Sequence, residues 1–317
     1  HYLHRHYSDC FEALDYIIIE KAAGLISQQQ QQLQRLKISD KPLPLRWCSL
    51  EEIPENSIKG CCFSNELIDA FPVHQVVIEG QQLKEIYVTT TKTATDSVAL
   101  DAQASSEINF VEVTDSLSTP KLAEYFDFIG IDLLSGAYPE GYRTEVNLVA
   151  LDWLNTVANR LQRGLLLTID YGYFAERYYQ PARHQGTLQC YYQHRHHNNP
   201  YLYIGQQDIT AHVNFTALER QGELCGLRKV GFTQQGLFLM ALGLGDRIGA
   251  LSARDSDRGN AIATGQDVIK IMQRRQSLHQ LMDPMGLGGF GVLVQSKGLT
   301  QQEEQVSLKG LTVPPMF

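Results

Sequence analysis

The sequence predicts a doubly wound α/β sheet that is interrupted by an inserted α+β lobe. Apolar runs long enough for buried strands recur along the 317 residues, and a helical pattern separates two of them, as in a strand–helix–strand crossover. An alternating pattern typical of a hairpin breaks this series. The composition, with 43% hydrophobic and 20% charged residues, excludes collagen-like, coiled-coil and wholly disordered proteins.

The first part of the chain carries two runs typical of buried strands. Residues 14–20 include a continuous β-branched run, the pattern of a strand covered on both faces. The Gln-rich segment 25–36 places apolar residues at helical spacing, which predicts a surface helix. A short extended piece is expected at 45–48, and a second buried strand at 59–66, where the run ends abruptly in polar residues.

The middle of the chain predicts a hairpin rather than another crossover. Residues 73–80 and 82–91 alternate apolar and polar side chains around Glu79-Gly80-Gln81, so we expect two antiparallel strands. The polar stretch 89–106 is rich in Thr, Ala and Ser and is interpreted as a loop. A strand is expected to follow at 108–113.

The second half returns to the crossover pattern. One apolar face predicts a helix from 146 to 162, which Gly164 ends, and residues 165–172 form a third buried run ending in an acid and a glycine. Beyond it we expect a loop-rich, tyrosine-dense segment at 172–203, and then a strand or the start of a helix at 208–215. Two helices are expected at 234–242 and 267–282, and a closing strand at 290–295.

These elements divide the chain into four parts. We expect the first part of the core at 1–72, an inserted hairpin or α+β lobe at 73–144, the second part of the core at 145–298 and a tail at 299–317. A loop region near 172–215 is expected on the substrate side of the core. Because the sequence opens on His1 without a methionine, we expect it to start within a longer protein.

Charge and side-chain chemistry narrow the classes of partner. The 27 basic and 35 acidic residues give a net charge of −8, which argues against nucleic-acid binding and permits a cationic substrate. No apolar run is long enough to span a membrane. The six cysteines lack a C-x-x-C pair and are interpreted as buried apolar side chains; the His-rich segment 193–200 is interpreted as a polar loop, so no metal is expected.

Acidic residues follow three of the predicted strands. They are Glu20, the acids of segment 65–69, and Asp170. Because ligands bind outside the carboxyl ends of strands in open α/β sheets, these positions indicate one cleft. An acid in the position of Glu20 can accept hydrogen bonds from both hydroxyls of a ribose, although a solvated strand-end acid remains an alternative. The glycine-rich turn that normally accompanies such an acid does not precede it in this sequence.

Several motifs resemble those of one enzyme family. The run from Ser64 to His74 resembles the N-E-L-L-D-A-L-P-V-H signature of the MidA-like methyltransferases, which depend on S-adenosylmethionine. This family includes a mitochondrial complex I assembly factor that acts as a protein arginine methyltransferase. Further segments resemble the family's Y-x-I-V-E, D-Y-G, G-T-L-R-x-Y, Q-D-L-T-A-H-V-D-F and G-x-x-x-Q motifs, in the same order, at 16–20, 170–172, 186–191, 207–215 and 231–235.

The resemblance implies a Rossmann-like S-adenosylmethionine-dependent methyltransferase that lacks its first strand and glycine-rich loop in these residues. It implies a protein arginine substrate, a complex I assembly-type role, a possible homodimer, and a cytoplasmic location or the mitochondrial matrix in a eukaryote. A pair of carboxylates can orient a guanidinium group. The expected cofactor-binding residues are Glu20, Asn65 and Glu66, the expected catalytic residues are Glu66, Asp69 and, as second choice, Asp170, and the expected substrate-channel residues are Tyr171 and His212.

Other interpretations stay open at the level of sequence. Asp69 could equally cap a turn, and His212 could be an ordinary hydrogen-bonded histidine. A non-catalytic assembly factor could keep the same fold and bind a partner protein through the hairpin at 73–91 and the tyrosine-rich loop at 171–203. A nicotinamide-dependent oxidoreductase also fits an acid after a second strand, but the sequence offers no motif specific to it.

Overall fold

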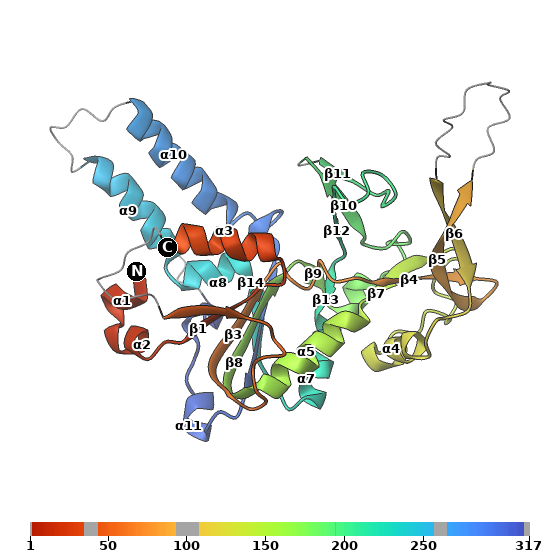
Figure 1. Cartoon of the computed structure of the whole chain (residues 1–317), viewed down its shortest axis with the longest axis horizontal. Coiled ribbons are helices and arrows are strands. Elements are labelled where there is room, and N and C mark those ends of the chain that lie inside the picture. The colour runs from red at the N-terminus through yellow and green to blue at the C-terminus, as the bar shows by residue number, and fades with distance from the viewer. Residues whose placement is uncertain (1, 35–43, 93–107, 194, 257–264, 314–317) are drawn as a thin grey trace.

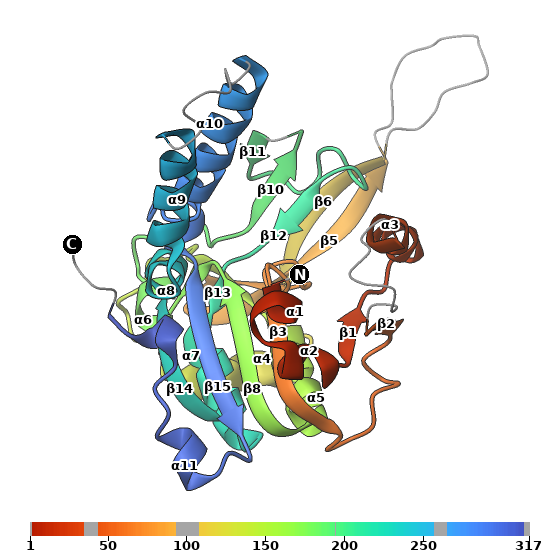
Figure 2. The ribbon, with the colours of Figure 1, turned by 90° about the vertical axis from the view of Figure 1, so that its left-hand side faces the viewer.

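The computed structural model describes residues 2–34, 44–92, 108–193, 195–256 and 265–313. Its core is a four-stranded sheet with the order β14-β15-β8-β3, seen side by side in Figure 2. The central strand β8 (Leu161–Asp170) pairs in parallel with β3 (Ile58–Asn65) and antiparallel with β15 (Gly291–Lys297). The sheet ends at β14 (Arg228–Gln234), which pairs antiparallel with β15. The predicted runs at 59–66, 165–172 and 290–295 are therefore neighbouring strands.

Helices cover both faces of this sheet (Figure 1). On one face, α5 (Leu148–Arg160) and α7 (Phe215–Leu224) bury Leu166 and Leu293. On the other face, α8 (Gln235–Ala241) packs over side chains of alternate positions in β8 and β15. This two-sided cover is the arrangement of a doubly wound sheet.

The remaining elements of the core are short or project from it. The predicted helices at 25–36 and 267–282 are confirmed as α3 (Ala23–Gln34) and α10 (Gly265–Gln280), whereas α9 (Leu244–Ser256) was not predicted. The two short helices at the start are α1 (Tyr2–His6) and α2 (Ser8–Glu12). The tail carries α11 (Gln301–Glu304) and one 3₁₀ turn, η2 (Lys309–Leu311), and the other 3₁₀ turn, η1 (Leu287–Gly289), precedes β15.

The strands β1 (Tyr16–Ile19) and β2 (Leu45–Cys48) form a separate parallel pair. Among the described residues, no strand is hydrogen-bonded between this pair and the outer edge of β3. The prediction that the runs at 14–20 and 59–66 are buried strands is therefore wrong in their burial: Tyr16 of β1 is 51% exposed, and Phe63 and Cys61 of β3 are exposed as well. An apolar run identifies each strand correctly. Burial also requires neighbouring elements, and the described residues supply no hydrogen-bonded strand along the outer edge of β3 or between it and β1.

The inserted lobe is an antiparallel sheet with the order β6-β5-β4-β7. The predicted hairpin is confirmed as β4 (His74–Glu79) and β5 (Gln82–Lys92), joined by Gly80 and Gln81, which both have positive φ, as a two-residue type I′ turn requires. The outer strands are β6 (Ile108–Asp115) and β7 (Arg143–Val146), and α4 (Lys121–Ile129) packs on the sheet. Most of the loop predicted at 89–106 lies outside the described residues.

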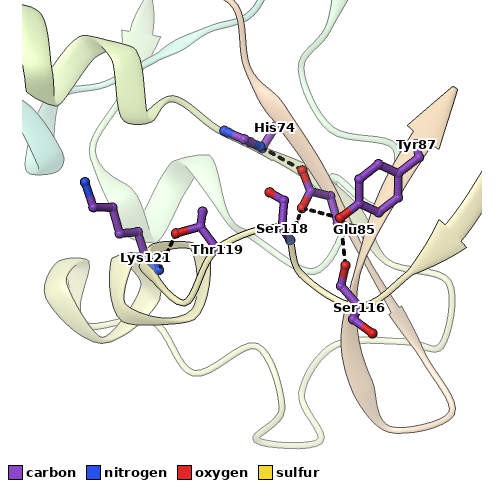
Figure 3. A network of polar contacts seen from close by, with 7 residues as sticks. All are labelled: His74, Glu85, Tyr87, Ser116, Ser118, Thr119 and Lys121. Atoms are coloured by element: carbon purple, nitrogen blue, oxygen red, sulfur yellow. Dashed lines mark hydrogen bonds and ion pairs between the residues drawn. The ribbon is translucent and has the colours of Figure 1, made fainter.

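A buried carboxylate holds the lobe together (Figure 3). Glu85 accepts the main-chain N–H of Ser118 at 2.6 Å and the Tyr87 hydroxyl at 3.1 Å, and it contacts His74 Nδ1 at 2.7 Å. Burial alone would raise the pKa of Glu85, but the hydrogen bonds from Ser118 and His74 lower it. This network fixes the segment that leads into α4 against the β4–β5 hairpin.

A second small sheet, with the order β11-β10-β12, stands beside the core (Figure 1). It contains β10 (Gln189–Tyr192), β11 (Arg195–His197) and β12 (Asp208–Thr210). The polar loop predicted at 193–200 is therefore partly wrong, because main-chain pairing with β10, which side-chain composition does not report, makes β11 a strand. Close to the core, β9 (Gly172–Tyr173) pairs with β13 (Val213–Asn214), and α6 (Ala175–Tyr178) follows β9.

Candidate functional site

An open cleft of about 810 Å³ lies where the ends of β3 and β8 meet the β10–β12 sheet. Five segments contribute its lining: 66–70, 171–173, 189–191, 207–212 and 284–290. Four of the residues predicted for the site line it: Glu66, Asp69, Tyr171 and His212. The structure thus brings together residues that lie up to 146 positions apart in the sequence, as the strand-end argument requires.

Glu66 begins the turn after β3 in an unusual backbone conformation. Its φ is +46°, a left-handed value that is uncommon outside glycine and is found more often at functional sites. Its N–H donates to the carbonyl of Ile169 at 3.0 Å, and the Asn65 amide donates to its carboxylate at 3.2 Å. The main chain therefore positions the Glu66 side chain at the cleft.

Asp69 is the most enclosed acid of the lining, with 5% of its surface exposed. The Tyr171 hydroxyl donates to its Oδ2 at 2.6 Å, whereas Oδ1 has no hydrogen-bond partner among the described residues. Burial raises the pKa of Asp69, and the negative charge of Asp208 adds to the rise. A buried carboxylate oxygen without a donor indicates a position that a ligand donor can fill.

Asp170 lies behind the cleft wall and does not line the cleft. Its Oδ2 accepts the N–H groups of Ile68 and Asp69 at 3.0 and 3.3 Å, and its Oδ1 accepts the N–H of Tyr171 at 2.9 Å. Burial, together with the charge of Asp69, raises the pKa of Asp170 to about 7. The geometry makes Asp170 a residue that fixes the turn carrying Glu66 and Asp69, whereas the sequence placed it as second choice for a catalytic role.

His212 closes the cleft within an aromatic group. Its ring stacks on Tyr173 and meets the edge of Tyr171, each at 5.2 Å between centroids. The guanidinium groups of Arg177 and Arg183 each lie 4.5 Å from the Tyr173 ring. Burial and the charge of Arg183 lower the pKa of His212 to about 4, so its ring is neutral at pH 7.

The sequence analysis missed Glu145, which holds the opposite wall of the cleft. The Glu145 carboxylate, on β7, accepts the N–H of Thr187 at 2.8 Å, its hydroxyl at 3.0 Å and the N–H of Leu188 at 3.3 Å. The Thr187 hydroxyl in turn accepts the N–H of His212 at 3.1 Å. Gly186 is required beside it, because a Cβ there would lie 2.1 Å from a Glu145 oxygen. Only the G-T-L motif at 186–188 could have indicated this site.

Two of the predicted cofactor-binding residues lie away from the cleft. Glu20 follows β1 in the separate strand pair, and its Oε1 accepts the N–H of Ala22 at 2.9 Å. Asn65 is exposed at the end of β3 and does not belong to the cleft lining. Of the three predicted strand ends, only the one after β3 therefore places acids, Glu66 and Asp69, in the lining of the described cleft. Asp170 lies behind the cleft wall, and Glu20 follows β1 in the separate strand pair.

Comparison with known families identifies the chain at this point. Residues 1–233 match a family described as "Putative S-adenosyl-L-methionine-dependent methyltransferase". The chain belongs to this family. The resemblance to MidA-like methyltransferases agrees with this membership, although the family description does not name them. Comparison with the curated proteins gives no match.

Two crystal structures from Burkholderia thailandensis resemble the chain. One is described as a COG1565 superfamily member and likely methyl transferase bound to S-adenosyl-homocysteine; its TM-score is 0.72 and its identity 27%, over 94% of this chain and 66% of that chain. The other is the native structure of an uncharacterized COG1565 superfamily protein, with a TM-score of 0.71 and 28% identity over 92% of this chain and 68% of that chain. This likeness confirms the Rossmann-like α/β fold class. The chain spans about two thirds of the length of these neighbours.

The described residues contain neither a membrane-spanning helix nor a metal-binding cluster. No helix within the described ranges is long and apolar enough to cross a membrane. In the same part of the chain, no group of three or more histidine, cysteine, aspartate or glutamate side chains could hold a metal ion. The cleft itself is lined by carboxylates, aromatic side chains and a neutral histidine.

Proposed function

We propose that the protein transfers a methyl group from S-adenosylmethionine to a nitrogen of a protein arginine. The observation that carries the proposal is the likeness over 94% of the chain to a structure that holds S-adenosyl-homocysteine, the product that this cofactor leaves after transfer. When bound, S-adenosylmethionine supplies a methyl group on a positively charged sulfur. Glu20, which follows β1, would hold the ribose of this cofactor, because a carboxylate at a strand end can accept hydrogen bonds from both ribose hydroxyls.

The chemistry of the cleft supports a cationic substrate. Its lining contains the carboxylates of Glu66, Asp69 and Asp208, and none of the described lining residues is a lysine or an arginine. Three oxygens at this site lack a partner among the described residues: Asp69 Oδ1, Gln207 Oε1 and Thr210 Oγ1. A guanidinium group carries five N–H donors and no acceptor, so it matches a site that is rich in acceptors.

The chain's own residues would orient the substrate and take up its proton. Glu66 and Asp69 can accept hydrogen bonds from a guanidinium and direct one of its nitrogens towards the methyl donor. Asp170 keeps these two acids in place through the main chain of the turn. The methylated nitrogen loses one proton, and Asp69 Oδ1 is placed to accept it, since burial raises the pKa of this carboxyl.

The resemblance to the MidA-like family supports the finer parts of the proposal. That family includes a complex I assembly factor that acts as a protein arginine methyltransferase, so we propose the same substrate class and an assembly-type role here. The six sequence motifs that carry the resemblance include the cleft segments 64–74, 170–172 and 207–215.

The test is methyl transfer from labelled S-adenosylmethionine to arginine-containing proteins, compared between the wild type and Glu66→Gln. Glu66 is exposed, so we expect the variant to fold, but to lose at least about a hundredfold in turnover. The matched control is Glu52→Gln, an exposed acid outside the cleft, which should keep its turnover. Wild-type turnover in Glu66→Gln would remove the assignment of this residue. No cofactor binding in calorimetry by the full-length protein would favour the non-catalytic assembly factor instead.

A further inference from the structure

The geometry points to a specific way of holding the protein substrate. We propose that a segment of the substrate lies extended along the free edge of β12 as an added strand, with its cationic side chain in the acidic base of the cleft and apolar neighbours on the rim. This inference rests on the proposed function and deepens it, because it names how the polypeptide around the reacting side chain is recognised.

The first observation concerns the edge of β12. This strand ends the β11-β10-β12 sheet, and no described strand pairs with its other edge. From β10, only Gln189 and Tyr191, which share one face, line the cleft. From β12, side chains of both faces line it, including Ile209 and Thr210. Since successive side chains of a strand point to opposite faces, the edge of β12 itself looks into the cleft.

The second observation is the placement of the acidic base beside this edge. The N–H of Ala211, directly after β12, donates to the carbonyl of Asp69 at 2.9 Å. The unpartnered oxygens Asp69 Oδ1 and Thr210 Oγ1 therefore belong to adjoining segments. A chain paired with β12 can direct one side chain to these acceptors, and a positive charge on it complements Asp69 and Asp208.

The third observation is the apolar rim. Met285 is 94% exposed and lines the cleft, and Ile209 and Tyr191 are exposed apolar residues of the same lining. A free cation would leave these side chains in water, whereas a polypeptide can cover them with apolar residues on either side of the cation. The rim therefore favours an extended protein segment over a small cationic molecule.

The edge is also held rigidly, which lowers the cost of ordering it on binding. The connection between β11 and β12 is fixed to the lobe, since the Tyr201 hydroxyl donates to Glu112 at 2.8 Å and its ring stacks on Phe110. Arg143 makes an ion pair with the same Glu112 carboxylate at 2.7 Å. At the start of β12, the Gln207 amide donates to the carbonyl of Pro200 at 2.8 Å.

Main-chain pairing is tested with a synthetic probe. A short peptide with a central arginine between leucines is compared by calorimetry with the same peptide methylated on the backbone nitrogens next to the arginine. N-methylation removes donors to β12 and blocks close approach while keeping every side chain, so we expect the affinity to fall about tenfold or more. Equal affinities of the two peptides would overturn the inference, as would an arginine amide that binds as tightly as the parent peptide.

The rim is tested on the protein with a matched pair of variants. Met285→Gln should weaken binding of the leucine-flanked peptide about threefold to tenfold and leave a glycine-flanked peptide unchanged. Leu224→Gln, at a residue of α7 that is 74% exposed and outside the cleft lining, should leave both affinities unchanged. If Met285→Gln weakens the binding of both peptides equally, the rim does not recognise apolar neighbours of the arginine, and the inference about the apolar rim is wrong.

The outcomes separate this inference from the proposed function. Backbone-dependent binding of the peptide by a protein that binds no S-adenosylmethionine would remove the methyltransferase proposal and leave the docking surface. Methylation of arginine amide as efficiently as of the peptide would leave the activity and remove the docking surface. The chain could also form a dimer with β12 at its interface. If sedimentation shows such a dimer, and the peptide neither binds it nor dissociates it, the edge belongs to a second copy of the chain and the inference is overturned.

Discussion

The two walls of the cleft are built in comparable ways, because each depends on one buried carboxylate. Asp170 holds the strand-end wall, and Glu145 holds the wall made by the β10–β12 sheet and His212. Both acids accept main-chain N–H groups, and burial raises the pKa of both. Neither carboxylate makes an ion pair within the described residues.

The two walls differ in how far the main chain alone determines them. All three hydrogen bonds of Asp170 come from N–H groups, two of them in the turn that carries Glu66 and Asp69. Glu145 reaches His212 only through the Thr187 hydroxyl, which is a side chain. We therefore expect loss of either carboxylate to destabilise the fold, whereas a change at the Thr187 hydroxyl alone should affect the cleft more selectively.

The largest expected effect is that of Asp170→Ala. The substitution leaves three N–H groups, two of them buried, without an acceptor, so we expect the free energy of unfolding to fall by about 4 kcal/mol. Denaturant unfolding followed by circular dichroism measures this change. Asp152→Ala, at an exposed acid of α5, is the control and should change the stability by less than about 0.5 kcal/mol. A loss of less than about 1 kcal/mol in Asp170→Ala would show that these N–H groups do not depend on the carboxylate.

The strand-end wall was also the part that the sequence could predict. Apolar runs identify β3 and β8, and polar residues mark the point where each strand ends, so the meeting of Glu66, Asp69 and Tyr171 follows from the topology of the sheet. Gly80 and Gln81 likewise identify the hairpin, because two positive φ values are the local requirement of its turn.

The second wall could not be predicted for a physical reason. Glu145 and Thr187 are 42 positions apart, and their hydrogen bonds exist only after the lobe has been placed against the core. The strand β11 is polar in composition and is defined by main-chain pairing with β10 alone. The burial of β1 and β3 was overestimated because an apolar pattern reports what a strand can bury and not which neighbours are present.

A second prediction concerns the pH dependence of the His212 wall. The folded protein keeps His212 neutral down to about pH 4, whereas the unfolded chain takes up a proton near pH 6.5. The unfolded state therefore binds more protons between these values, and the contribution of His212 to stability falls as the pH falls from 6.5 towards 4. The shift corresponds to about 3 kcal/mol.

This contribution is isolated by comparing the wild type with His212→Asn over the same pH range. Asp69 and Asp170 titrate in both proteins, so their effects cancel in the difference between the two unfolding curves. We expect the wild type to lose about 3 kcal/mol more than the variant between pH 6.5 and pH 4. Parallel curves would show that His212 is as accessible to protons in the folded state as in the unfolded one.

The smallest expected effect, and the most selective, is at Thr187. Thr187→Val keeps the shape of the side chain but removes the hydroxyl that joins Glu145 to the His212 N–H, whereas Thr187→Ser keeps it. We expect Thr187→Val to lose about 1 to 2 kcal/mol of unfolding free energy and to weaken binding of an arginine peptide, and Thr187→Ser to restore the binding. Cofactor binding should not change in either variant, because the hydroxyl contacts Glu145, Tyr178 and the N–H of His212, none of which is a predicted cofactor-binding residue. Restored stability without restored peptide binding in Thr187→Ser would show that the hydroxyl supports the fold and does not position the cleft.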